Sequence, residues 1–243
     1  MKIIQISDTH ICKEKNNVFF SQISMVNLKK ITDDIKKHKD ISAVLITGDI
    51  SQDGTIESYI NSLELLENIN PPIYCIPGNH DNIENMCEAF SSSNIRIISD
   101  AVEIDGWEFH YINTTIPGED CGLIDDYNLN LIRKKLSETT NNVVIVTHHH
   151  ILPVGTQLVD ECMVLNTDEL LKVLDENKSV KLVMCGHVHG DYKITRGHYC
   201  METSPATCFQ WIKETKTPHV IHSIGYKVFT FHSNNYESEC IFL

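Results

Sequence analysis

The chain places a polar cluster after each of five short apolar runs, and this repeated arrangement limits the folds open to it. The runs are Ile3 to Ile6, Ala43 to Thr47, Ile73 to Ile76, Val143 to Thr147 and Lys181 to Cys185. The clusters are Asp8-Thr9-His10, Gly48-Asp49, Gly78-Asn79-His80-Asp81, His148-His149-His150 and Gly186-His187-Val188-His189. Short runs rich in β-branched and apolar residues are typical of strands buried on both faces. We therefore expect five such strands to carry their polar clusters to one edge of a sheet.

Helical patterns lie between several of these strands. Apolar residues recur at helical spacing over Asn27 to His38 and Ile56 to Ile69, and further helices are expected over Leu129 to Leu136 and Asp168 to Leu174. Alternation of strand and helix favours parallel strands joined by helical crossovers. The carboxyl ends of such strands are the usual position of a functional site. The sequence thus predicts an α/β fold with its site at that edge.

The C-terminal quarter follows a different pattern. It contains extended segments with turn signals at Arg196-Gly197 and Ser233-Asn234-Asn235. The segments are Tyr192 to Thr195, His198 to Glu202, Val220 to Ile224, Tyr226 to His232 and Glu237 to Phe242. We expect antiparallel strands here. Because 42% of the 243 residues are hydrophobic and no Pro/Gly/Ser-rich linker divides them, residues 1–243 are predicted to form a single domain.

Charge and cysteine content exclude several classes of protein. The net charge of −13 argues against nonspecific binding of long nucleic acids, which requires a basic face. A small anionic substrate stays compatible, because bound cations would reverse the local field. The nine cysteines are scattered without a Cys-x-x-Cys pair, which disfavours a disulfide framework or a thiolate zinc site. Without a signal-peptide core or a membrane-length apolar run, we expect a reduced cytoplasmic protein with no membrane partner.

Each polar cluster has a simpler explanation when it is taken alone. Asp8-Thr9-His10 fits a helix N-cap beside a surface histidine, and Gly48-Asp49 fits an ordinary turn. Asp81 and Glu84 have the spacing of a capping box for a helix that continues through Met86 and Phe90. His187 and His189 lie on the same side of an extended segment, which suits ligands of neighbouring metals and isolated core histidines equally.

The joint occurrence of the clusters favours a metal site over these separate explanations. Five independent alternatives would all have to hold at the ends of five strands. Carboxylate, imidazole and amide groups are ligands for metal ions such as Mn, Fe and Zn. The sequence therefore predicts a site for two metal ions. Among His148, His149 and His150, only one is expected to be a ligand, with the other two behind it or at the surface.

The series Asp-x-His, Gly-Asp, Gly-Asn-His-Asp, His and Gly-His-x-His resembles the calcineurin-like metallophosphoesterases from Asp8 to His189. Three further stretches are similar to the bacterial class III cyclic-nucleotide phosphodiesterases, which hydrolyse 3′,5′-cyclic AMP. They are Ile4 to His10, Ser204 to Gln210 and Gly225 to Val228. The resemblance implies the metallophosphoesterase fold, a four-layer α/β/β/α sandwich of two mixed sheets. It also implies a small-molecule phosphodiester substrate, with 3′,5′-cyclic nucleotides foremost.

The resemblance also implies a set of ligand roles for two divalent or mixed-valence metal ions. The first metal would be bound by Asp8, His10 and His189, the second by Asn79, His148 and His187, and Asp49 would bridge the two. One departure concerns the usual His-His-Pro-Pro, which reads here as His148-His149-His150-Ile151-Leu152-Pro153. His148 keeps the ligand position because it directly follows the strand.

Two such ions about 4 Å apart can activate a bridging hydroxide for in-line attack on phosphorus and neutralise the phosphate oxygens. By resemblance, His80 is the catalytic histidine that is not a ligand; it would stabilise the charge that develops and protonate the leaving alkoxide. Asp81 is the second catalytic candidate, because we expect its carboxylate to orient the His80 imidazole if its two oxygens are shared between this role and helix capping.

The sequence determines the substrate less well than it determines the metal site. Thr207-Cys208-Phe209-Gln210 fits a purine contact or a plain strand or loop, and Pro117 to Asp126 fits a loop over the site or a surface connection. One alternative function is a broad-specificity phosphodiesterase, a phosphomonoesterase or, least of all given the charge, a nuclease. The other is a noncatalytic metal-binding scaffold, which would be expected to lack ligands that this chain carries.

Overall fold

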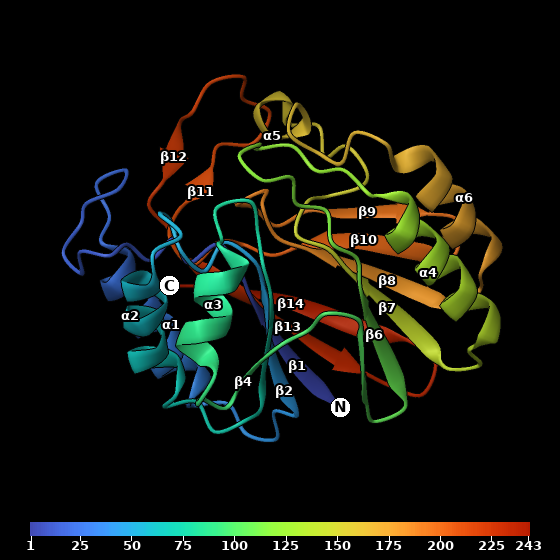
Figure 1. The fold of residues 1–243 in the computed structure, drawn as a ribbon, viewed down its shortest axis with the longest axis horizontal. Helices are drawn as coiled ribbons and strands as arrows, with labels where there is room; N and C mark the ends of the chain where they lie inside the picture. The colour runs from blue at the N-terminus through green and yellow to red at the C-terminus, as the bar shows by residue number, and fades with distance from the viewer.

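In the computed structural model, which describes residues 1–243, two six-stranded sheets pack face to face with helices on their outer sides (Figure 1). The first sheet has the order β14-β13-β1-β2-β3-β4 and the second the order β5-β6-β7-β8-β10-β9. The strands of the first sheet are β1 (Lys2–Ile6), β2 (Ala43–Thr47), β3 (Ile73–Ile76), β4 (Ile95–Ile97), β13 (Gly225–Phe231) and β14 (Tyr236–Phe242). Those of the second are β5 (Ala101–Ile104), β6 (Trp107–Tyr111), β7 (Asn142–Val146), β8 (Val180–Cys185), β9 (Lys193–Arg196) and β10 (Tyr199–Thr203).

Three hydrophobic clusters separate four layers. Alternate residues of one strand point to opposite faces of its sheet, so in β7 Val144 and Val146 join the cluster between the sheets. Val143 and Ile145 of the same strand join a different cluster, shared with the helices outside the second sheet. Both faces of the central strands are therefore buried. The predicted four-layer sandwich of two mixed sheets is confirmed.

Six helices connect the strands: α1 (Ser24–Ile35), α2 (Ile56–Leu66), α3 (Ile83–Phe90), α4 (Asp126–Glu138), α5 (Gln157–Asp160) and α6 (Thr167–Glu176). Helices α1 to α3 cover the first sheet and share its outer cluster, whereas residues of α4 and α6 belong to the cluster outside the second. Helices α2 and α4 have N-caps formed by side chains. The Thr55 side chain accepts a hydrogen bond from the backbone N–H of Ser58, and the Asp125 side chain accepts one from the backbone N–H of Asn128. None of the helices is long and apolar enough to cross a membrane.

The five predicted strands are present as β1, β2, β3, β7 and β8, but the expectation that they share one sheet is wrong. Strands β1 to β3 are parallel neighbours in the first sheet, and β7 and β8 are parallel neighbours in the second. Buried parallel strands look alike in sequence whichever sheet they join. The polar clusters consequently reach the site from two sheets.

The C-terminal quarter is also only partly antiparallel. Strand β13 pairs antiparallel with β1 and β14, and β9 pairs antiparallel with β10, but β10 runs parallel to β8. Of the expected strand Val220 to Ile224, only β12 (Val220–Ile221) forms, and it pairs with the short β11 (Gln210–Trp211). The chain thus returns to the first sheet after completing the second, which brings the segment around β11 beside the polar clusters.

Candidate dimetal centre

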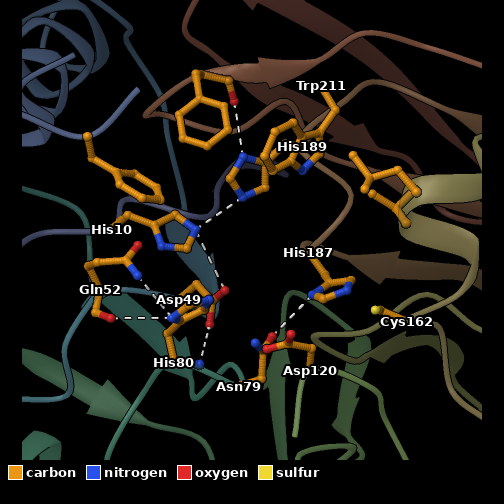
Figure 2. Close-up of a pocket in the computed structure, with 14 residues that line it drawn as sticks. His10, Asp49, Gln52, Asn79, His80, Asp120, Cys162, His187, His189 and Trp211 are labelled. Carbon is orange, nitrogen blue, oxygen red and sulfur yellow. Dashed lines mark hydrogen bonds and ion pairs between the residues drawn. The ribbon is translucent and has the colours of Figure 1, made fainter. Parts of the chain in front are cut away.

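A cavity of about 270 Å³ lies where the loops after the strands of both sheets meet (Figure 2). Six of the predicted site residues line it: His10, Asp49, Asn79, His80, His187 and His189. His10 follows β1, Asp49 follows β2, and Asn79 and His80 follow β3. His187 and His189 follow β8 from the second sheet. Two of the other predicted residues, Asp8 and His148, are fully buried beside them.

Unusual backbone geometry distinguishes the predicted ligands. Five of the seven adopt left-handed conformations: Asp8, His10, Asp49, His187 and His189, with φ of 54°, 46°, 51°, 64° and 45°. This region costs non-glycine residues free energy and persists only where the surrounding structure enforces it. Here the sharp bends turn successive side chains from each loop toward one point. Such strain is concentrated at functional sites, which supports the sequence-based choice of residues.

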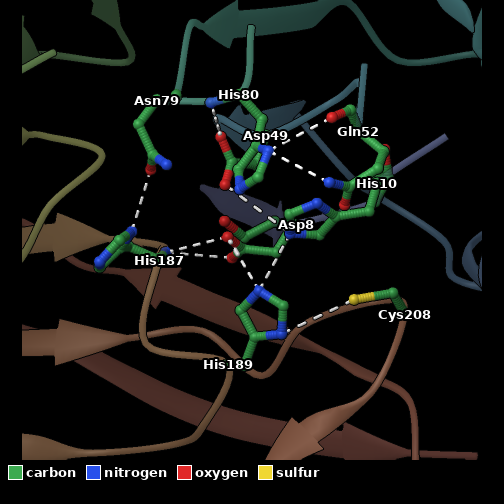
Figure 3. A network of polar contacts seen from close by, with 12 residues as sticks. Asp8, His10, Asp49, Gln52, Asn79, His80, His187, His189 and Cys208 are labelled. Carbon is green, nitrogen blue, oxygen red and sulfur yellow. Dashed lines mark hydrogen bonds and ion pairs between the residues drawn. The ribbon is translucent and has the colours of Figure 1, made fainter. Parts of the chain in front are cut away.

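Glycines permit the close approach of the loops. A Cβ on Gly78 would overlap the carboxylate of Asp49, and a Cβ on Gly186 would overlap the hydroxyl of Ser7. The backbone N–H of His187 can then donate to the Asp8 carboxylate at 3.1 Å, which joins the two sheets at the site (Figure 3). Any side chain at these two glycines would push the predicted ligands apart.

The hydrogen bonds of two histidines determine which ring nitrogen faces the centre. His148 Nδ1 donates to the backbone carbonyl of Thr47 at 2.8 Å, and His189 Nδ1 donates to that of Phe209 at 3.2 Å. A carbonyl only accepts, so in both neutral rings the lone pair is on Nε2. Metal-binding histidines are commonly held this way by a partner on the other nitrogen.

Lone pairs therefore point toward one another within the buried cluster. His148 Nε2 lies 2.9 Å from Asn79 Oδ1 and 3.4 Å from Asp49 Oδ2. His189 Nε2 lies 3.5 Å from Asp8 Oδ1 and 3.1 Å from His10 Nε2, while the other nitrogen of His10 is buried without a hydrogen-bond partner. Acceptors converging away from water are unfavourable unless a cation or proton lies between them.

Burial shifts the pKa values of several predicted ligands toward their uncharged forms. Burial raises the pKa of Asp8 to about 7 and lowers that of His10 to about 4. Burial also lowers the pKa values of His187 and His189 well below their usual range, which keeps both rings neutral and able to bind a metal. Burial opposes protonation of His148, but the Asp49 and Asp8 carboxylates and the Thr47 carbonyl together outweigh burial and raise the pKa of His148 to about 9.

The donor set fits two metal ions. Asp49 belongs to two groups of potential ligand atoms that lie within 4.8 Å of one another, one with His10 and His80 and the other with Asp8 and His148. His10 and His148 likewise belong to two such groups each, so the potential ligand atoms form one continuous cluster. Asn79 Oδ1 lies 3.1 Å from His187 Nδ1 as well as next to His148, so the three face a common point. Nitrogen and oxygen ligands of this kind suit Mn, Fe or Zn.

His80 lies at the cavity with one ring nitrogen engaged. Its Nδ1 is 3.3 Å from the backbone carbonyl of Gln52 and 3.3 Å from the Gln52 side-chain amide nitrogen. Its backbone N–H donates to Asp49 Oδ1 at 2.9 Å, and its ring packs edge-on against that of His10. Both Gln52 contacts involve Nδ1, so Nε2 is the atom left for a ligand.

The expected contact between the Asp81 carboxylate and the His80 imidazole is not formed. The Asp81 carboxylate accepts from the backbone N–H groups of Ile50, Ser51 and Gly78 at 3.2, 2.9 and 2.8 Å, and from the Tyr59 hydroxyl at 3.1 Å. The capping prediction is wrong too, because Asn82 is the N-cap of α3 and accepts from the N–H of Asn85. Asp81 instead joins the loops after β2 and β3, whose N–H groups satisfy its charge.

The three consecutive histidines are all buried, so the surface alternative for two of them is wrong. His149 Nδ1 pairs with the Thr114 hydroxyl at 2.8 Å, and its Nε2 donates to the backbone carbonyl of Asp120 at 3.1 Å. Burial lowers the pKa of His149 to about 3. His150 Nε2 pairs with Asp160 at 3.2 Å. His148 is the one of the three whose ring nitrogen faces Asp49 and Asn79.

The sequence alone missed several residues of the cavity. Asp120 and Phe209 line the cavity; they fall in Pro117 to Asp126 and Thr207 to Gln210, for which the sequence left open either a place at the site or an ordinary loop. Gln52 was missed, although its position three residues after the Asp49 cluster is a signal that could have found it. The remaining lining residues come from loops, the short helix α5 and the short strand β11, without a distinctive pattern: Phe19, Leu158, Val159, Cys162 and Trp211.

Comparison with known proteins places the chain in a family. The family model of calcineurin-like phosphoesterases matches residues 1–191. A probable cyclic nucleotide phosphodiesterase from Coxiella burnetii is 31% identical over 245 residues, covering 100% of this chain and 98% of that protein. A 3′,5′-cyclic adenosine monophosphate phosphodiesterase from Haemophilus influenzae is 26% identical over 213 residues, covering 87% and 78%.

Solved structures agree in fold. A dimetal phosphatase from Danio rerio superimposes with a TM-score of 0.75 at 14% identity, covering 100% of this chain and 98% of that one. A purple acid phosphatase from yellow lupin gives a TM-score of 0.66 at 14% identity, covering 99% of this chain and 53% of that one. With the family model matching most of its length, the chain belongs to the calcineurin-like phosphoesterases, metal-dependent hydrolases of phosphoric esters.

Proposed function

We propose that this chain hydrolyses 3′,5′-cyclic nucleotides, with cyclic AMP foremost, to nucleoside monophosphates. The observation that carries the proposal is the convergence of the ring nitrogens and carboxylates of the predicted ligands beside the cavity. The relatives from Coxiella burnetii and Haemophilus influenzae, both named for cyclic-nucleotide hydrolysis, support the choice of substrate.

The ligand roles are part of the proposal. Asp8, His10 and His189 would hold the first ion and Asn79, His148 and His187 the second, with Asp49 between them. When bound, the two ions would supply an activated water as nucleophile and neutralise the nonbridging phosphate oxygens. Thr47 and Phe209 keep the histidines in the tautomers this requires, through the carbonyl contacts described above.

His80 would act on the substrate directly. Because Nδ1 is held by the Gln52 carbonyl, Nε2 is free to contact a phosphate oxygen or the leaving alkoxide. In its doubly protonated form the ring would donate that Nε2 proton as the O–P bond breaks. Asp81 would contribute indirectly, by holding the loop that carries His80 against the loop that carries Asp49.

A substrate panel tests the proposal. Metal-reconstituted protein would be assayed with cyclic AMP, cyclic GMP, a 2′,3′-cyclic nucleotide, an aryl phosphodiester and a monoester. We expect turnover of cyclic AMP that is abolished by a chelator and restored by added metal. Activity confined to monoesters would overturn the proposed substrate class, and turnover of generic diesters alone would indicate a broad-specificity phosphodiesterase.

Ligand variants separate catalysis from mere metal binding. Asp49→Asn should lose activity and bound metal together, with Asp168→Asn as the control because Asp168 is exposed on α6. Metal content would be measured by mass spectrometry of the purified protein. Metal binding without hydrolysis of any ester would favour the noncatalytic scaffold, and undiminished hydrolysis in Asp49→Asn would remove the dimetal mechanism.

A further inference from the structure

Aromatic side chains form one wall of the cavity, beside the predicted ligands. Phe19, Phe209 and Trp211 line it, and we call these three residues the aromatic wall. The Trp211 ring is stacked on His189 with an interplanar angle of 26° and a centroid separation of 5.6 Å, and the Phe209 ring lies 4.8 Å from the same histidine (Figure 2). The aromatic wall thus begins at the metal centre.

A strained turn holds the outer part of this wall. The backbones of Phe19 and Gln22 exchange hydrogen bonds of 2.8 and 2.9 Å, which closes a two-residue turn over Phe20 and Ser21. Both central residues have positive φ, 46° and 59°. A turn of this type, I′, favours asparagine and glycine, and a bulky aromatic residue there is an outlier. Other contacts must therefore hold the turn in this shape.

Packing and hydrogen bonds supply that constraint. The Phe20 ring lies 4.9 Å from Phe209 and 5.4 Å from Trp211, so it braces the aromatic wall from behind. The side-chain amide of Asn27 donates to the Gln22 side chain at 3.1 Å and to the Cys208 carbonyl at 3.0 Å. The turn is thereby joined to the segment that carries Phe209.

Two of the wall's rings are placed to touch a ligand. Phe209 is 1% exposed and serves as support, whereas Phe19 and Trp211 are half-buried and line the cavity. A phosphate bound at the predicted ligands would bring the group attached to it into the same cavity. Flat aromatic groups stack favourably on such rings, whereas a polar alcohol would gain little from them.

We propose that Phe19 and Trp211 determine substrate specificity by stacking on the nucleobase of the substrate. This inference rests on the proposed function, because it assigns the base of a cyclic nucleotide to the aromatic wall. The phosphate is recognised by the metal centre whatever alcohol it carries. The wall makes a cyclic nucleotide a better substrate than a diester of equal charge without a base.

Kinetics of paired substrates test the inference. Phe19→Ala and Trp211→Leu should each raise KM for cyclic AMP by about ten-fold, the size of effect typical for loss of base stacking, while kcat changes little. A ribose 3,5-cyclic phosphate with a methyl group in place of the base should show no change. Phe242→Ala is the matched control, because Phe242 lies on β14 and is 50% exposed. Equal losses for both substrates would overturn the inference.

A second variant guards against a purely structural effect. Phe19→Leu keeps an apolar side chain at the turn but removes the aromatic face, and its melting temperature should stay close to that of the parent protein. We expect its KM for cyclic AMP to rise as in Phe19→Ala. An unchanged KM in a folded Phe19→Leu protein would show that the ring packs the turn without contacting the base.

Tryptophan fluorescence gives a readout that does not depend on turnover. The chain has two tryptophans, and Trp107 is 3% exposed with its indole N–H donating to the His232 carbonyl. In a Trp107→Phe background, AMP should quench Trp211 and ribose 5-phosphate should not. If no cyclic nucleotide is hydrolysed but AMP still quenches Trp211, only the proposed function fails. If cyclic AMP is hydrolysed and AMP does not quench, only the stacking inference fails.

Discussion

A buried ion pair joins the two sheets and gives the sharpest prediction about stability. Lys227 on β13 and Glu202 on β10 lie 2.9 Å apart, and their side chains are 3% and 0% exposed. Asp191 approaches the same ammonium at 2.7 Å. Because Glu202 and Lys227 come from different sheets, their interaction resists separation of the sandwich.

Lys227→Met would leave the Glu202 carboxylate buried without its main counter-charge. Breaking a buried pair by removal of one partner costs roughly 3–5 kcal/mol. Lys193 at 2.8 Å and the Tyr236 hydroxyl at 2.8 Å still contact Glu202, which favours the lower end of that range. For a chain of this size, a loss of about 3 kcal/mol lowers the melting temperature by about 6–12 °C.

The loss should depend on pH. Burial alone raises the pKa of Glu202, but Lys227, Lys193 and Ser238 together outweigh burial and hold the pKa below its usual value. A depressed pKa stabilises the folded state above the unfolded pKa, about 4.3 for Glu, and the stabilisation disappears as pH falls through the lower folded value. In Lys227→Met, burial raises the pKa of Glu202, and protonation of its carboxylate removes the cost of burying an unpaired charge. The difference in unfolding free energy between the parent protein and Lys227→Met should therefore become smaller in acid.

Urea unfolding of the metal-free protein at about pH 7 and about pH 4 measures these differences. The control is Lys193→Met, because Lys193 pairs with the same carboxylate but its side chain is 52% exposed, and it should cost less than about 1 kcal/mol. Adding Glu202→Gln to Lys227→Met should recover part of the stability by removing the stranded charge. Equal losses for the two lysine variants, or a Lys227→Met loss independent of pH, would refute the reasoning.

Three further predictions concern the loops of the site. Gly186→Ala should lower the metal content of the purified protein and destabilise it by about 1–3 kcal/mol, because the new Cβ overlaps the Ser7 hydroxyl; normal metal binding would contradict this. His80→Ala should lower kcat by about 10²- to 10⁴-fold with metal content unchanged, as steady-state kinetics and metal analysis would show, whereas metal loss would make His80 a ligand. Asp81→Ala should lower the free energy of unfolding, measured in urea, by about 3 kcal/mol, because three backbone N–H groups lose their acceptor. Asn82→Ala should lower it by about 1 kcal/mol, because α3 loses its N-cap. A larger loss for Asn82→Ala than for Asp81→Ala would indicate that Asp81 is the helix cap.

Buried strands were the most predictable part of the fold. The predicted bounds of Ala43 to Thr47 and Ile73 to Ile76 match β2 and β3, because short apolar runs bounded by turn residues are typical of strands buried on both faces. Strands β5 and β6 were not predicted. In β5, exposed and half-buried residues alternate at the sheet edge, and such a pattern is weak in sequence. β5 pairs with β6 across the two-residue turn Asp105-Gly106, a local hairpin signal that the sequence-based prediction did not use.

The prediction that Asp81 caps α3 was wrong for a physical reason. Asp81 and Asn82 are both good helix caps, and the spacing of Asp81 to Glu84 favoured the first. The backbone N–H groups of Ile50 and Ser51 decide the matter, because they lie about thirty positions earlier in the chain and draw the Asp81 carboxylate away from the helix. Asn82 is then the residue left to cap α3.

The sequence by itself determined which chemical groups follow which strands, because strand periodicity and polar residue type are local properties. The tertiary structure alone decided that the groups converge from two sheets, and which nitrogen each histidine presents. His148 is oriented by the Thr47 carbonyl, 101 positions away, and His189 by the Phe209 carbonyl beyond two further strands. The tertiary structure also places the strained turn at Phe20 against Phe209, a contact that no local sequence pattern predicts. Groups can be recognised locally, but their orientation depends on partners that only folding brings within reach.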